Sequence, residues 1–132
     1  MALESCNVFF AHPQHFTQGE TYYATGTKLA SDGHPQKILM AYSVTEGKKV
    51  WSYPQAGRGN SWGGTLTTAG NLLFFGNDTG ALEAVDARTG RSLWQFNTGQ
   101  SFRASPMSYA VDGAQYVAIA AGGDIVSFSL PH

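Results

Sequence analysis

The sequence has very little cysteine and no long apolar run. Its single cysteine, Cys6, has no partner for an internal disulfide, so the fold is not cross-linked within the chain. No apolar stretch approaches the roughly 18 residues that a membrane-spanning helix needs. Residues 1–10 include Glu4 and lack a positive start followed by an apolar segment. We therefore expect neither a membrane span nor a signal peptide here.

Charge is also sparse, and it is balanced. Only 13% of residues are charged, the formal net charge is −1, and no segment concentrates lysine or arginine. Without a concentrated positive field, neither a nucleic-acid partner nor an anionic membrane surface is expected. The sequence also lacks a phosphate-cradling glycine loop, a CxxC pair and the Ser/His/Asp order of a hydrolase triad.

What the chain does contain is typical of β-structure. Hydrophobic residues make up 42% and aromatic residues 13%, which is ample material for a core. Sixteen glycines and many Thr, Ser, Tyr and Phe give a turn-rich composition, and no long window repeats apolar residues at helical spacing. At 132 residues, the chain predicts one all-β domain or less.

An internal repeat organises the sequence. Ala84–Trp94 is echoed by Ala41–Trp51, with alanine, glycine and tryptophan each recurring 43 residues later. The register continues from Leu39 and Leu82 to Ile125. A fixed period in the low forties is the length of one four-stranded propeller blade. The glycine suits a tight hairpin turn, and the tryptophan offers a flat apolar face to fill the wedge between blades.

The repeat predicts about three propeller blades in a single propeller fragment over residues 1–132, with approximate bounds 7–54, 62–97 and 103–131. The last blade lacks its fourth strand, because no third Thr-Gly turn or tryptophan follows Leu130. A polar loop is expected over Thr27–Gln36. The expected strands are Asn7–Ala11, Thr21–Thr25, Lys37–Ser43, Lys49–Tyr53, Gly63–Thr68, Leu72–Phe75, Ala81–Asp86, Ser92–Phe96, Ala104–Tyr109, Gln115–Ala121 and Asp124–Leu130.

Three stretches carry a family resemblance. They are Trp62–Gly76, which begins W-G-G-T-L-T-T-A-G, then Arg103–Met107, and Asp112–Gly123. Together with the two copies of A-x-[DS]-x-x-x-G-x-x-x-W, which are similar to the tryptophan-docking repeats of quinoprotein propellers, they resemble the carboxy-terminal region of PQQ-dependent alcohol dehydrogenases. The likeness is dense from Ser61 to Pro131 and thinner from Cys6 to Tyr53.

The resemblance implies a fold, cofactors and a location. Members of the family are eight-bladed propeller oxidoreductases, periplasmic in bacteria, that hold pyrroloquinoline quinone (PQQ) over a calcium ion on the propeller axis. Their catalytic aspartate, their calcium ligands and a vicinal cysteine pair come from earlier blades, so no catalytic or metal residue carries over to this chain. Asp124 stands where related methanol dehydrogenases have a tryptophan near the site.

One cofactor contact does carry over by resemblance. Trp62 matches the family tryptophan that touches the quinone, and Gly63 and Gly64 would then allow close backbone approach. The alternative is that Trp62 only packs between blades. Arg103 could pair with an acidic group on the axis, although an arginine at a strand start is more often a surface or blade-stabilising residue.

Three functions stay open from the sequence. The chain could supply blades and a quinone contact to alcohol oxidation, and be inactive alone. It could instead be a non-catalytic quinoprotein-like module for protein–protein interaction, or a stand-alone self-assembling β module. Because three blades cannot close a ring, we expect either the remaining blades or a second copy of the chain, in a homo-oligomer, to cover the exposed faces. The edge of the last blade could accept residues 1–11 of another copy.

Overall fold

The computed structural model describes residues 2–3, 7–10, 17–20, 26–29, 37–57 and 63–130, with the backbone alone for 2–3, 7–10 and 26–29. All regular structure in these residues is β. The strands are β1 (Ala2–Leu3), β2 (Asn7–Phe10), β3 (Gly26–Leu29), β4 (Ile38–Ser43), β5 (Lys48–Pro54), β6 (Thr65–Thr67), β7 (Leu72–Gly76), β8 (Ala81–Asp86), β9 (Ser92–Asn97), β10 (Met107–Val111), β11 (Ala114–Ala121) and β12 (Asp124–Ser129). The described residues contain no helix that could cross a membrane.

The chain divides into two compact units. The larger one comprises Met1–Leu3 and Gln36–His132, and the smaller one Glu4–Pro35. In the smaller unit β2 and β3 pair antiparallel, from Asn7 opposite Leu29 to Phe10 opposite Gly26. The expected loop is therefore wrong over Thr27–Leu29, because pairing with an apolar neighbour decides strand formation more than local composition does. The strand expected over residues 21–25 lies outside the described residues.

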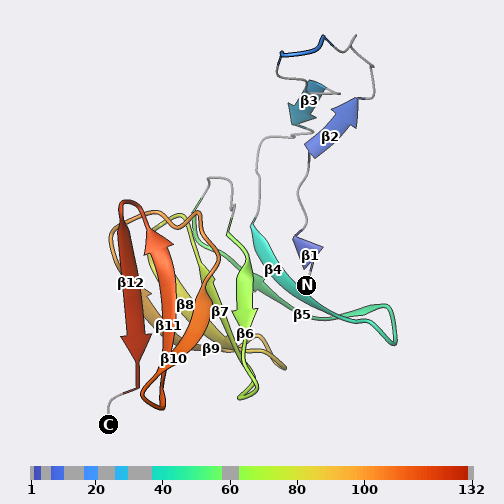
Figure 1. Cartoon of the computed structure of the whole chain (residues 1–132). Helices are drawn as coiled ribbons and strands as arrows, with labels where there is room; N and C mark the ends of the chain where they lie inside the picture. Colours follow the sequence, from blue (N-terminus) through green and yellow to red (C-terminus); the bar gives the residue numbers. More distant parts are fainter. Residues whose placement is uncertain are drawn as a thin grey trace. The chain divides into compact units, whose positions relative to one another are not determined.

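Three antiparallel sheets make up the larger unit (Figure 1). Their strand orders are β1-β4-β5, β6-β7-β8-β9 and β10-β11-β12. The central sheet is a complete four-stranded meander, and the last sheet has three strands. The predicted fold class is confirmed: the described residues are all-β and form a partial propeller, and the last blade has three of its strands within them, without a fourth. The division of the whole chain at 7–54, 62–97 and 103–131 stays a prediction.

The two repeats share a backbone irregularity at the same place. The β4–β5 ladder shifts register between Ala41 and Tyr42, and the β8–β9 ladder shifts between Ala84 and Val85. Both bulges lie immediately before the tryptophan-bearing positions of the outer strands. Since a bulge increases local twist, both outer strands are bent in the same way.

Apolar cores lie between successive sheets. The first core contains Leu39 and Trp51 from β4 and β5 together with Leu73, Phe75 and Val85 from β7 and β8. The second contains Leu82, Phe102, Ile119 and Ala121. Strand β8 contributes to both cores because alternate side chains of one strand point to opposite faces. This strand is therefore the most buried element of the described chain.

Trp51 joins the first sheet to the turn that follows β8. Its indole Nε1 donates a hydrogen bond to the Ala87 carbonyl oxygen at 3.0 Å, and the side chain is 8% exposed. A Cβ atom at Gly90, where φ is +72°, would lie 2.7 Å from the indole ring. Trp51 thus packs between the first sheet and the turn that follows β8. Trp94 is 39% exposed and packs edge-on against Phe128, with ring centroids 5.2 Å apart.

Candidate cofactor-binding site

The segments that lead into β6 and β10 lie against each other. The Gly64 amide donates a hydrogen bond to Ser105 Oγ at 2.8 Å. A Cβ atom at Gly63 would come within 2.6 Å of the Ala104 carbonyl oxygen. The two glycines therefore allow close approach between neighbouring blades, a contact that the sequence motif did not predict.

Trp62 lies outside the described residues, as do Cys6, His12 and His15. The structure therefore gives no position for the indole that the resemblance assigns to the quinone. The cofactor-contact role of Trp62, Gly63 and Gly64 stays a prediction.

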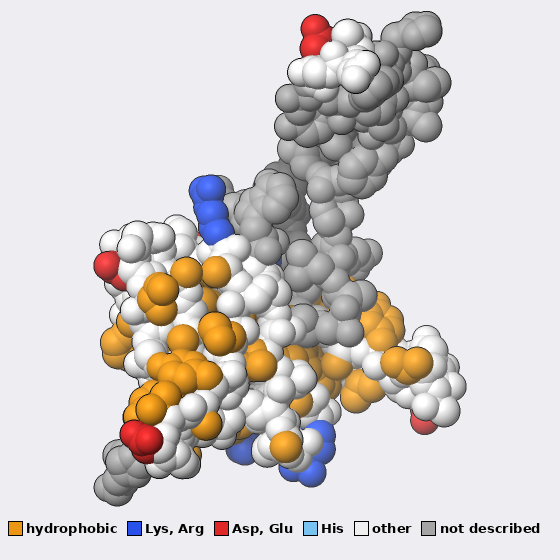
Figure 2. Space-filling model, viewed as in Figure 1, with side chains coloured by type: hydrophobic (Ala, Val, Ile, Leu, Met, Phe, Trp, Pro, Cys, Tyr) orange, Lys and Arg blue, Asp and Glu red, His pale blue; other side chains and the backbone are white. Residues whose placement is uncertain are grey.

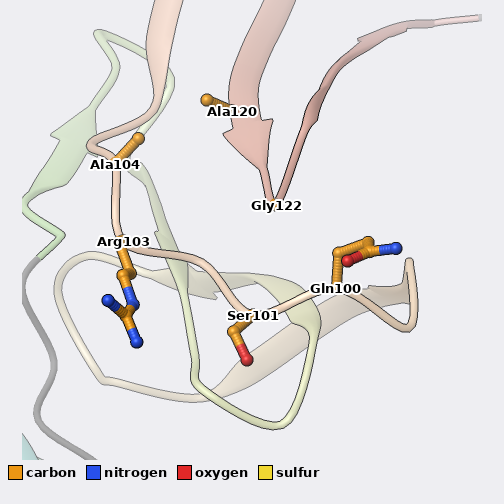
Figure 3. Close-up of a pocket in the computed structure, with 6 residues that line it drawn as sticks. All are labelled: Gln100, Ser101, Arg103, Ala104, Ala120 and Gly122. Atoms are coloured by element: carbon orange, nitrogen blue, oxygen red, sulfur yellow. The ribbon is translucent and has the colours of Figure 1, made fainter.

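A hollow of about 400 Å³ opens beside this pair of segments (Figure 3). Its lining consists of Gln100, Ser101, Arg103, Ala104, Ala120 and Gly122. In Figure 3 the side chains of Arg103 and Ser101 extend from one side of their segment, and that of Gln100 extends from the other side. The lining includes no acidic side chain. Arg103 is exposed at the edge of this hollow, which agrees with the surface position that is common for an arginine at a strand start.

A buried polar group crosses the interface between the first two sheets. Glu83 on β8 is 3% exposed, and its carboxylate accepts hydrogen bonds from Tyr53 Oη at 2.5 Å and Asn77 Nδ2 at 2.6 Å. The hydrogen bond to Glu83 raises the pKa of Tyr53, with burial and the negative charge acting in the same direction. Asn77 lies in the turn between β7 and β8. The sequence signal for this group is Glu83, an acidic residue within the otherwise apolar run Ala81–Val85.

The turn that receives Trp51 is held by a carboxylate. Asp86 Oδ1 accepts hydrogen bonds from the amides of Arg88 at 2.9 Å and Thr89 at 3.0 Å. The bond from the Arg88 amide, followed by those from Thr89, lowers the pKa of Asp86. Asp86 therefore shapes the turn and gives no indication of acid–base chemistry.

Acidic groups elsewhere in the described residues are dispersed. Lys37 Nζ pairs with Asp78 Oδ1 at 2.7 Å, and both side chains are largely buried. Within the described ranges no three His, Cys, Asp or Glu residues gather closely enough to hold a metal ion. The described residues thus form packed blades, with a hollow beside the segment that leads into β10.

The sequence of the chain matches a known family of propeller domains. The family model for the β-propeller domain of glucose/ethanol/alcohol dehydrogenases of the PQQ type matches residues 54–117. This stretch is a segment of a quinoprotein propeller. The match spans the central sheet and both segments that lead into β6 and β10.

Relatives of this quinoprotein segment are alcohol dehydrogenases. The quinoprotein alcohol dehydrogenase PedH of Pseudomonas putida is 41% identical over 85 residues, which cover 64% of this chain. The crystal structure of the quinohemoprotein alcohol dehydrogenase from Comamonas testosteroni aligns with a TM-score of 0.65 and 38% identity over 78% of the chain. A europium-containing methanol dehydrogenase aligns with a TM-score of 0.67 and 28% identity over 86%.

The quinoprotein segment is short compared with these proteins. It spans 14% of the length of PedH, 15% of the Comamonas testosteroni chain and 20% of the methanol dehydrogenase chain. The last of these is named for europium, so the metal of the relatives is not restricted to the calcium expected from the resemblance.

Proposed function

We propose that the chain contributes propeller blades and a quinone contact to a PQQ-dependent alcohol dehydrogenase. The observation that carries this proposal is the family match over residues 54–117, which includes the contact between Gly63–Gly64 and Ala104–Ser105. In this function the catalytic base and the metal ligands belong to other blades. The chain alone is then inactive in alcohol oxidation.

The donors of the described residues suit a carboxylated quinone. The Gly64 amide is already bound to Ser105, so it supplies no donor to the cofactor. Arg103 and Gln100 are exposed residues at the edge of the adjacent hollow, whose described lining contains no carboxylate. When bound, PQQ would supply the two-electron acceptor for the alcohol. The protein would supply binding and orientation.

Trp62 is the proposed cofactor contact of the chain. It directly precedes Gly63, the glycine that lies against Ala104 at the junction between neighbouring blades. An indole provides stacking area together with one N–H donor, which suits the ring and the oxygen atoms of a quinone. We expect the rest of the cofactor surface to be covered by other blades.

Reconstitution of the chain with PQQ and calcium tests the proposal. We expect a change in the quinone absorbance and no dye-linked alcohol oxidation. Trp62→Ala should abolish the absorbance change, whereas Trp94→Ala, the same truncation at the tryptophan that packs against Phe128, should preserve it. Alcohol oxidation by the chain alone would refute the assignment of the catalytic base to other blades. Unchanged binding in Trp62→Ala would refute the quinone contact.

We also propose a periplasmic location for the assembled enzyme, following the family resemblance. The expected partner in that compartment is the remaining part of the propeller. Subcellular fractionation with an antibody against the chain tests this proposal, and recovery with cytoplasmic markers alone would contradict it.

A second candidate function is self-assembly, and a surface observation favours it. Figure 2 shows hydrophobic side chains gathered over the sheet β10–β12, where Met107, Val111 and Ile125 are exposed. An exposed apolar sheet face of this kind is typical of an interface. A second copy of the chain would cover it in a homo-oligomer. Light scattering of the purified chain tests this, and a monomer at all concentrations would exclude it.

A further inference from the structure

The side chain of Asp78, in the turn between β7 and β8, reaches the first sheet. Its Oδ1 atom pairs with Lys37 Nζ at 2.7 Å, and the side chains of Lys37 and Asp78 are only 13% and 17% exposed. Lys37 directly precedes β4, so the pair joins the second sheet to the first. Because a largely buried charge without its counterion is costly, the pair holds the turn in one position against the first sheet.

The same carboxylate contacts the segment that leads from β5 towards β6. A Cβ atom at Gly57 would overlap the Asp78 carboxylate, and Gly57 has a φ of +96°, which residues with a side chain rarely adopt. The Gln55 amide donates to the Lys37 carbonyl oxygen at 2.8 Å. Both partners of the ion pair therefore contact the chain just after β5.

The backbone of the turn holds a second segment, the one that leads into β10. Ser101 Oγ donates to the Asp78 carbonyl oxygen at 3.3 Å, and the Phe102 amide donates to the Asn77 carbonyl oxygen at 3.4 Å. Phe102 is 1% exposed and belongs to the second core, so this attachment cannot shift without disturbing close packing. Asp78 thus contacts one segment through its side chain and the other through its backbone.

These two segments are the ones that meet at the candidate cofactor-binding site. One continues along the chain to Gly64 and the other to Ser105, where the Gly64 amide donates to Ser105 Oγ at 2.8 Å. We propose that Asp78, held by Lys37, is a positioning residue that sets how the two segments meet at this junction. Its effect on the cofactor is exerted only through the junction, and that part of the inference rests on the proposed function.

Removal of the carboxylate charge tests the proposal in the full chain. Asp78→Asn breaks the ion pair while the side chain keeps its size. The double variant Lys37→Met/Asp78→Asn leaves no unpaired charge, so it supplies a folded chain should the single variant unfold. Lys37→Arg is the conservative change that keeps the pair. Asp86→Asn is the matched control, because Asp78 and Asp86 lie in the two turns at opposite ends of β8.

Hydrogen exchange of two amides, followed by NMR, separates positioning from a general loss of stability. The Gly64 amide reports the junction, and the Gly90 amide, which donates to the Asp86 carbonyl oxygen at 2.8 Å, reports the opposite turn. Asp78→Asn and the double variant should speed Gly64 exchange by about tenfold or more without a matching change at Gly90, because the junction opens locally. Lys37→Arg should resemble the wild type, and Asp86→Asn should affect Gly90 alone. Unchanged Gly64 exchange in Asp78→Asn, or equal acceleration of both amides, overturns the positioning role.

Titration of the same variants with PQQ, followed by absorbance, tests the connection with the cofactor. Asp78→Asn should bind PQQ about tenfold more weakly because the junction is less well ordered for binding, and Asp86→Asn should bind it like the wild type. If Gly64 exchange responds but PQQ binds to no variant, wild type included, the positioning role stands and the proposed function fails. Equal PQQ binding by the wild type and Asp78→Asn, with Gly64 exchange unchanged, overturns the positioning role and leaves the proposed function intact. Equal PQQ binding despite faster Gly64 exchange overturns the connection between the junction and the cofactor.

Discussion

The Tyr53–Glu83–Asn77 group allows a strict test of how the first two sheets are joined. Asn77 cannot reverse its amide, because its Oδ1 atom accepts from the Ala81 amide at 2.9 Å and from both the amide and the hydroxyl of Thr79. Its Nδ2 must therefore face residue 83. The carboxylate of Glu83 has an oxygen for each of its two donors, whereas a glutamine in its place has only one.

Glu83→Gln should therefore destabilise the chain by about 1–3 kcal/mol although the side chain keeps its size, because one buried donor loses its acceptor. Tyr53→Phe should cost about 1.5–3 kcal/mol, the range for a hydrogen bond to a charged group. In the double variant the single glutamine oxygen accepts from Asn77, and the phenylalanine that replaces Tyr53 has no hydroxyl that needs an acceptor. The destabilisation of the double variant should thus be smaller than the sum of the two single destabilisations by about 1–2 kcal/mol.

Urea denaturation followed by circular dichroism measures these free energies of unfolding. Tyr42→Phe is the control, because Tyr42 is exposed and, among the described residues, its hydroxyl donates to Met40 Sδ at 3.8 Å, so its cost should stay within about 0.5 kcal/mol. The wild type should also lose stability above pH 10, since the raised pKa of Tyr53 favours its neutral form in the folded state. Strict additivity of the two substitutions, or a Tyr53→Phe cost no larger than that of Tyr42→Phe, would refute the reasoning.

Three further substitutions probe the packing and the turn. Gly76→Ala should lower the free energy of unfolding by about 1–3 kcal/mol, because its Cβ would lie 2.5 Å from Phe102 Cγ. Gly123→Ala, with open space around its Cβ, should be nearly neutral. Equal costs of the two substitutions would contradict this reasoning. Trp51→Phe should cost about 1–3 kcal/mol through loss of its N–H donor and ring area, and an unchanged denaturation midpoint would contradict the packing role. Asp86→Ala should destabilise the fold at neutral pH, and the deficit should shrink as pH falls below about 4, because the lowered pKa of Asp86 stabilises the folded state only while the carboxylate is charged. A deficit that is independent of pH would indicate that Asp86 acts through packing instead.

The repeat made much of the larger unit predictable. The spacing between Trp51 and Trp94 identified the hairpins β4–β5 and β8–β9, because their strands pair locally across short turns. The strand β3 was missed because its pairing with β2 joins segments that lie further apart in the sequence. Local composition does not indicate which distant segment a strand will pair with.

The candidate site was less accessible from the sequence. The motif assigned Gly63 to close approach of the quinone, whereas the carbonyl that a Cβ atom at Gly63 would meet belongs to Ala104, in the next blade. Likewise, Arg103 gives no sign in the sequence that Phe102 anchors it beside a hollow. Such relations arise when sheets stack, so periodicity along one strand cannot predict them.

The contact between Trp51 and the next sheet has an implication for how blades diverge. Its indole meets a backbone carbonyl at Ala87 and the bare backbone of Gly90. Apart from the need for glycine, neither contact depends on the identity of a side chain in the receiving blade. Successive units could therefore exchange most of their surface residues, or be shuffled by recombination, and still recognise their neighbours.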